Sequence, residues 1–140
     1  MRNRKQSWPY TLGEVPLFAD CSATELEGIS SLLTAVDVRA GTPLLREDEH
    51  DWQFIVIAEG YAQVTRGGRD VAVVGPGTFI GEIALLERVP RSATVTAVTP
   101  LTVYVANAAE FATLLDLAPS VAEKVRATAA SRLEANRQAA

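Results

Sequence analysis

The chain has 140 residues, of which 48% are hydrophobic and 21% charged, so it fits one globular domain with a buried core and is not disordered. Its net charge of -4 argues against the broad basic face that non-specific nucleic-acid binding requires. The single cysteine, Cys21, cannot form an internal disulfide, and the longest uninterrupted apolar run, residues 54–58, is far too short to cross a bilayer. We therefore expect a cytoplasmic protein without a membrane segment.

The N-terminal part combines an arm without a pattern and one helix. Residues 1–13 are predicted to be a loose arm, followed by one domain at residues 14–140. The segment from Ser22 to Glu25 matches a capping box, in which the serine accepts a hydrogen bond from the backbone and the glutamate side chain reaches back. Apolar residues at helical spacing follow, so a helix is predicted at residues 23–34.

Between residues 35 and 107 short β-rich runs alternate with turn signals. The dipeptide Gly67-Gly68 joins two such runs and favours a two-residue hairpin turn, because glycine tolerates positive φ at both positions. Connections this short leave no room for the crossovers of a parallel sheet. The predicted fold class is therefore mainly β, an antiparallel jelly roll (double-stranded β-helix) with flanking helices.

The segment after the β-rich region has helical character. Residues 108–117 are rich in alanine and leucine, and Pro119 suits the first turn of a further helix that reaches about residue 136. This last helix has one weakly apolar face, which should pack on the jelly roll or on another helix.

The stretch at residues 75–95 contains two charged residues in surroundings where a charge is unexpected. Glu82 follows a glycine in an apolar segment, and Arg91 lies between a proline and a run of small residues. A carboxylate accepts from a hydroxyl, and a guanidinium donates to two oxygens of one anion, so the two together suit a sugar that carries a compact anion. The alternative is a structural ion pair between Glu82 and Arg91 that closes the turn.

Neighbouring residues offer further groups to such a ligand. Residues 83–86 can form one short helical turn, whose free N–H groups favour an anion. Ser92 adds a hydroxyl donor, and the small side chain of Ala93 leaves its backbone N–H accessible.

Residues 79–95 read FIGEIALLERVPRSATV and resemble the phosphate-binding cassette of the cyclic nucleotide-binding domain family. The family pattern is roughly FGELAL, a few variable residues, and then PR, a small residue and ATV. The resemblance extends over residues 15–132 and implies one N-terminal helix, the jelly roll and C-terminal hinge helices. It implies a sensor that binds cAMP, or cGMP, without a further cofactor, and that moves its C-terminal helix when the ligand binds.

The resemblance also implies a role for each cassette residue. Glu82 would accept from the ribose 2′-hydroxyl, Arg91 would pair with the phosphate oxygens, and Leu85 would couple the ligand to the hinge helix. The base would rest on Val64 or Val73. The ligand-binding residues implied in this way are Gly81, Glu82, Ile83, Ala84, Arg91, Ser92 and Ala93, with Arg132 as the candidate that covers the base.

Two positions depart from the common pattern of the family. Asp48 stands in a turn that often has glycine, and because aspartate tolerates left-handed φ, we expect a changed turn and an intact fold. Ser92 stands where alanine is common in cAMP sites and threonine in many cGMP sites. A hydroxyl there can meet the amino group of guanine, so the base preference stays open, with cAMP ahead.

Other functions fit the sequence less well. His50 is the only histidine and cannot build a multi-histidine metal site or a Ser-His-Asp set, so neither a metal centre nor an enzyme is expected. A DNA-binding regulator is disfavoured, because only Gln138, Ala139 and Ala140 follow the last helix. The alternative to a sensor is a jelly-roll interaction module with a degenerate, ligand-free site. The expected partners are a cyclic nucleotide and an effector protein or missing effector domain, without nucleic acid.

Overall fold

The computed structural model describes residues 12–139, and its elements follow the order predicted from the sequence. The helices are η1 (Pro16–Phe18), α2 (Ala23–Leu32), α3 (Glu82–Glu87), α4 (Ala108–Leu117) and α5 (Pro119–Ala139). The strands are β1 (Thr34–Val38), β2 (Pro43–Leu45), β3 (Gln53–Glu59), β4 (Ala62–Arg66), β5 (Arg69–Val74), β6 (Phe79–Ile80), β7 (Thr94–Ala97) and β8 (Leu101–Asn107).

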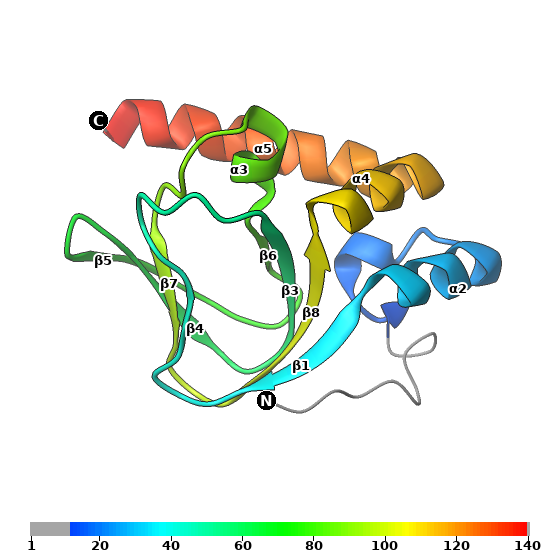
Figure 1. The fold of residues 1–140 in the computed structure, drawn as a ribbon, viewed down its shortest axis with the longest axis horizontal. Helices are drawn as coiled ribbons and strands as arrows, with labels where there is room; N and C mark the ends of the chain where they lie inside the picture. The colour runs from blue at the N-terminus through cyan, green and yellow to red at the C-terminus, as the bar shows by residue number, and fades with distance from the viewer. Residues whose placement is uncertain (1–11, 140) are drawn as a thin grey trace.

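The strands form two four-stranded sheets, with the orders β1-β8-β3-β6 and β2-β7-β4-β5. Every pairing between neighbouring strands is antiparallel. The two sheets face each other, and the helices lie outside the roll, with α5 running across α3 (Figure 1). The predicted antiparallel jelly roll with flanking helices is confirmed.

Strand β3 explains the longest apolar run of the sequence, because both of its faces are buried. Phe54 and Val56 belong to a core shared with the helices, whereas Ile55 and Ile57 belong to a second core between the two sheets. A strand that is buried on both faces needs no polar alternation, so its sequence is continuously apolar. The sheet that contains β3 therefore separates the two cores of the domain.

The helices begin where the sequence signals predict. The capping box of α2 is present, with Glu25 N donating to Ser22 Oγ at 3.1 Å and Ser22 N donating to Glu25 Oε1 at 2.8 Å. Asn107 and Glu110 form a second capping box at the start of α4. Helix α5 continues to Ala139, beyond the predicted end near residue 136, because no glycine or proline interrupts it.

The turns also follow their residue types. Gly67 and Gly68 have φ angles of 59° and 77°, as the predicted two-residue hairpin requires. Asp48 has a φ of 68°, so the aspartate adopts the left-handed conformation expected at a glycine position.

The predicted arm lies mostly outside the described residues, which begin at Leu12. Leu12 is fully buried in the core shared with the helices, so packing begins slightly before the predicted boundary at residue 14. Within residues 12–139, none of the helices combines the length and the apolar character that a membrane span requires.

Candidate functional site

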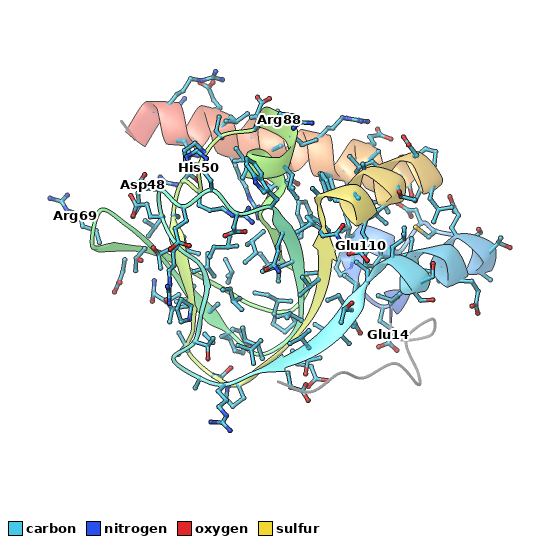
Figure 2. The ribbon with its side chains drawn as sticks, viewed as in Figure 1. Glu14, Asp48, His50, Arg69, Arg88 and Glu110 are labelled. Carbon is cyan, nitrogen blue, oxygen red and sulfur yellow. The ribbon has the colours of Figure 1, made fainter. Side chains whose placement is uncertain are left out.

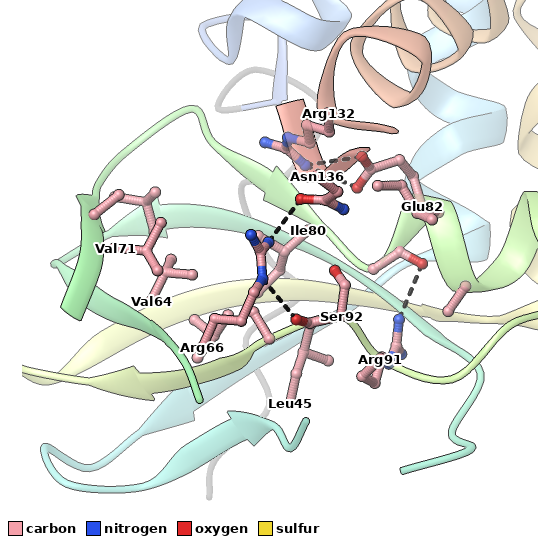
Figure 3. Close-up of a pocket in the computed structure, with 17 residues that line it drawn as sticks. Leu45, Val64, Arg66, Val71, Ile80, Glu82, Arg91, Ser92, Arg132 and Asn136 are labelled. Carbon is pink, nitrogen blue, oxygen red and sulfur yellow. Dashed lines mark hydrogen bonds and ion pairs between the residues drawn. The ribbon is translucent and has the colours of Figure 1, made fainter. Parts of the chain in front are cut away.

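A pocket of about 290 Å³ opens between the second sheet, α3 and the C-terminal half of α5 (Figure 3). Its walls are largely apolar, and its charged lining residues are Arg66, Glu82, Arg91 and Arg132. The structure brings all the predicted ligand-binding residues to this pocket: Gly81, Glu82, Ile83, Ala84, Arg91, Ser92, Ala93 and Arg132. Their contact with a ligand stays a prediction, but their convergence on one cavity is a property of the fold.

Arg91 is held rigidly although its side chain is charged and only 3% exposed. Its Nη2 forms an ion pair with Asp51 and donates to the Gln53 carbonyl at 2.7 Å, and its Nη1 donates to the Gly81 carbonyl at 3.0 Å. Its Nε is buried and has no hydrogen-bond partner among the described residues. A buried donor without an acceptor is unfavourable, so Arg91 retains one donor that a ligand oxygen can satisfy.

Gly81 allows this arrangement because the backbone passes very close to Arg91. Its φ is 94°, and a Cβ atom at this position would lie 2.3 Å from the Gln53 carbonyl oxygen and 2.8 Å from Arg91 Nη1. Only glycine has both the conformational freedom and the missing side chain that this position requires.

Glu82 is the second buried charge of the pocket, at 1% exposure. Its partner is Arg132 of α5, whose Nη1 donates to Oε1 at 2.8 Å and to Oε2 at 2.9 Å. The same Nη1 donates to the Phe79 carbonyl at 2.8 Å, and the guanidinium lies 5.2 Å from the centre of the Phe79 ring. Burial raises the pKa of the Glu82 carboxyl above its usual value, and the Arg132 guanidinium offsets part of the rise.

The alternative interpretation, an ion pair between Glu82 and Arg91, is wrong. Arg91 pairs with Asp51 and Glu82 pairs with Arg132, so the two charges have separate partners. The guanidinium of Arg91 donates to the carbonyl of Gly81, the residue before Glu82, rather than to the Glu82 carboxylate.

Leu85 lies outside the pocket. It does not line the cavity and is partly buried against the core that the helices share. This position suits the predicted coupling role, which stays a prediction.

The apolar wall of the pocket comes from β4 and β5. One expectation about this wall, that Val73 belongs to it, is wrong. Val64 lines the pocket as predicted, but Val73 does not and is 61% exposed. Val73 lies between Ala72 and Val74, which both line the cavity, and successive strand residues point to opposite faces. Val71 lines the cavity instead, although it is two residues from Val73, because the pairing of β5 with β4 steps from Ala72 to Asp70 and the resulting β-bulge at Val71 interrupts the alternation.

Two polar residues of the pocket were not found from the sequence, Arg66 at the end of β4 and Asn136 on α5. Arg66 Nε donates to the Ser92 carbonyl at 2.9 Å, and Arg66 Nη2 donates to Asn136 Oδ1 at 2.7 Å. In the sequence Arg66 precedes a hairpin and Asn136 lies in a polar helix end, and such residues usually face solvent. Only the close approach of α5 to the sheet shows their position.

His50 and Cys21, which the sequence analysis also considered, do not line the pocket. Figure 2 shows His50 on the loop before β3, and its ring centroid is 6.3 Å from that of Trp52. In the part of the chain that the structure describes, no three His, Cys, Asp or Glu side chains are grouped to hold a metal ion. Cys21 is half-buried, and burial raises the pKa of its thiol, so it is a poor nucleophile.

The chain is similar in sequence to one protein family and to several known proteins. The profile of the family described as the cyclic nucleotide-binding domain matches residues 35–117. A cAMP-dependent protein kinase regulatory subunit of Yarrowia lipolytica is 37% identical over 102 residues, which cover 71% of this chain and 27% of that protein. A cyclic nucleotide-gated potassium channel of Mesorhizobium japonicum is 36% identical over 118 residues, which cover 84% of this chain and 33% of that protein. The chain therefore spans a third or less of these relatives.

The fold agrees with these matches. The crystal structure of the Thermus thermophilus catabolite activator protein superimposes with a TM-score of 0.77 at 26% identity, over 88% of this chain and 60% of that chain. The profile match contains the roll, the cassette residues and the pocket wall. The chain belongs to the cyclic nucleotide-binding domain family, a family of regulatory ligand-binding domains rather than of catalysts.

Proposed function

We propose that the pocket binds a 3′,5′-cyclic purine nucleotide, cAMP or cGMP, and that the domain is a sensor that reports the ligand through α5. The observation that carries this proposal is the pair of buried charges on one apolar cavity, Arg91 at 3% exposure and Glu82 at 1%. Each charge already has one partner in the fold, and a cyclic nucleotide supplies a further complementary group to each, a phosphate oxygen for the unpaired Nε of Arg91 and a ribose hydroxyl for the Glu82 carboxylate.

The phosphate binds at Arg91. Asp51 and two backbone carbonyls fix the guanidinium, so its free Nε meets a phosphate oxygen without a loss of side-chain entropy. The backbone of Ser92 and Ala93 borders the same end of the cavity. Preorganised, charge-assisted hydrogen bonds of this kind are the strong ones.

The ribose binds at Glu82. A carboxylate has about four acceptor positions, so the 2′-hydroxyl can donate to one oxygen while Arg132 stays on the other. Because Arg132 holds both oxygens in the structure, the ribose changes the contact that fastens α5 to the cassette.

Helix α5 is the element that responds. Arg132 and Asn136 lie one turn apart on α5 and reach Glu82 and Arg66, which belong to the cassette and to the roll. A ligand that enters between these pairs shifts the position of α5 by its differential affinity for the two arrangements. Leu85 links α3 to the core beneath α5 and transmits the shift.

The lengths of the relatives indicate what kind of partner the domain has. The relatives named above are much longer than this chain and include a kinase regulatory subunit and a channel. We therefore assign the output to an effector protein or a further domain that α5 contacts, and we place the domain in the cytoplasm, where cyclic nucleotides act.

Calorimetry with cAMP and cGMP on the wild type and Arg91→Ala tests the proposal. We expect the affinity of Arg91→Ala to fall by about 30-fold or more, the effect of removing one partner of a buried, charge-assisted contact. Arg69→Ala is the matched control, because it removes the same charge from the exposed tip of the β4–β5 hairpin (Figure 2). Thermal melts of both variants show that they are folded.

Absence of heat and of a thermal shift for the wild type with both nucleotides contradicts the sensor. It would favour the interaction module with a degenerate site, which the two buried charges and the family match do not favour.

A further inference from the structure

The base of a bound nucleotide has one place left in the pocket. With the phosphate on Arg91 and the ribose on Glu82, the remaining volume lies between the β4–β5 wall and α5. Figure 3 shows Arg66 and Asn136 there, between Val64 and Val71 on one side and Arg132 on the other. These two polar side chains therefore border the base.

Two acceptors near this volume already receive hydrogen bonds from Arg66. Arg66 Nε donates to the Ser92 carbonyl at 2.9 Å, and Arg66 Nη2 donates to Asn136 Oδ1 at 2.7 Å. The wall residues Val64, Val71 and Ala72 carry no side-chain acceptor. The Ser92 hydroxyl is the one uncommitted group here that can either donate or accept.

The groups that remain free are donors. Neither Arg66 Nη1 nor Asn136 Nδ2 has a hydrogen bond within residues 12–139. A guanidinium can only donate, so Asn136 must present Oδ1 to Arg66, and its Nδ2 is the end left for a ligand. The contact with Arg66 thus fixes the orientation of the Asn136 amide.

Purine bases differ in what they offer to such donors. Guanine and hypoxanthine present two adjacent acceptors, O6 and N7, whereas adenine presents N7 beside an N6 amino donor. A pair of donors such as Arg66 Nη1 and Asn136 Nδ2 therefore matches a 6-oxopurine and leaves the adenine amino group facing another donor.

We infer that this domain prefers 3′,5′-cyclic nucleotides with an oxygen at C6 of the purine, and that Asn136, oriented by Arg66, determines the preference. The inference rests on the proposed function, because it assumes that phosphate and ribose occupy Arg91 and Glu82. It differs from the expectation from the sequence, which placed cAMP ahead, and the titrations below decide between the two.

Calorimetric titration of the wild type with cAMP, cGMP and cIMP is the direct test. Cyclic IMP has the oxygen at C6 but lacks the 2-amino group of guanine, so it separates the Asn136 contact from any contact of Ser92 with that amino group. We expect cIMP and cGMP both to bind more tightly than cAMP, by about fivefold or more, the discrimination of a good hydrogen-bonded base contact.

The variant Asn136→Asp gives the sharper test. An aspartate accepts with both oxygens, so one can pair with Arg66 and the other can accept from the adenine amino group. We expect Asn136→Asp to reverse the order and favour cAMP, and Asn136→Ala to bind the three nucleotides about equally. Gln138→Glu is the matched control, because it adds the same charge to an exposed position of α5 outside the pocket, and it should keep the wild-type order.

Several outcomes overturn the inference. Wild-type binding of cAMP as tight as that of cIMP and cGMP contradicts it, and so does an equal loss of affinity for all three nucleotides in Asn136→Asp. A preference for cGMP over both others that disappears in Ser92→Ala assigns the selectivity to Ser92 instead. If the wild type binds none of the three, the proposed function fails and the inference fails with it.

Discussion

The two halves of the pocket are built in different ways. The phosphate and ribose half comes from one continuous stretch, residues 79–95, with Asp51 and Arg132 as supports. The base half comes from β4, β5 and α5, which are far apart in the sequence. The first half can be recognised as a motif, whereas the second exists only once the helix lies against the sheet.

The halves also differ in burial. Arg91 and Glu82 are almost completely buried, whereas Arg66 and Asn136 are half-buried. Buried charges interact strongly and are expensive to leave unpaired, whereas exposed polar contacts are weakened by water. Substitutions in the cassette half should therefore change stability and binding, and those in the base half should change mainly ligand preference.

Gly81→Ala should give the largest effect. The added methyl group would lie 2.3 Å from the Gln53 carbonyl oxygen, so we expect a loss of about 3 kcal/mol or more in the free energy of unfolding. Gly41→Ala is the matched control, because Gly41 also has a positive φ, 84°, but nothing lies within 4 Å of the added atom. We expect about 1–2 kcal/mol there, from the left-handed backbone alone. Equal losses in urea denaturation would show that the cassette is not tightly packed.

Arg132→Met should give the next largest effect, because it removes the charge that pairs with buried Glu82. We expect a loss of about 1–3 kcal/mol at pH 7, reduced from a fully buried pair because Arg132 is 36% exposed. The loss should shrink as the pH falls, since a protonated Glu82 needs no cation. Adding Glu82→Gln to Arg132→Met should restore most of the stability, and a double-mutant cycle that shows additivity would contradict the coupling.

Glu82→Gln should stabilise the domain while it weakens binding. Burial raises the pKa of Glu82 above its usual 4.5, so the folded protein binds a proton that the unfolded chain releases. Stability therefore falls as the pH rises from about 4.5 through the raised pKa, and the ionised carboxylate subtracts from stability at pH 7. Glutamine keeps an acceptor for Arg132 without the charge, so we expect a gain of about 1 kcal/mol at pH 7 and a flatter dependence on pH.

Denaturation of wild type and Glu82→Gln across the pH range measures this difference. Calorimetry should show weaker nucleotide binding by the same variant. A variant that is less stable than the wild type at pH 7 would mean that the pair with Arg132 outweighs the cost of burial.

Val64→Ala and Val73→Ala should give the smallest effects and test the wall of the base half. Val64 lines the pocket, whereas Val73 is 61% exposed on the other face of β5. We expect Val64→Ala to weaken nucleotide binding by about 1 kcal/mol, the value of the apolar contact removed, and Val73→Ala to leave the affinity unchanged. Calorimetry measures both, and an effect of Val73→Ala would place the base elsewhere.

Local sequence patterns determined much of this protein. The capping box at Ser22, the glycine pair of the hairpin and the position of α4 depend on contacts a few residues apart, so the chain itself specifies them. The cassette residues belong to one short stretch with a recognisable order, and the fold gathers them around one pocket.

The tertiary structure alone decided which charges meet. Glu82 and Arg91 are close in the sequence, yet their partners Arg132 and Asp51 come from remote segments. The choice of Val71 over Val73 depends on the bulge in the pairing of β5 with β4, and the contact of Arg66 with Asn136 depends on how α5 approaches the roll. Ion pairs and side-chain hydrogen bonds act through space over a few ångströms, and sequence patterns record only neighbours along the chain. The phosphate half of the site can therefore be predicted from the sequence, whereas the base half is determined by the packing of α5 against the sheet.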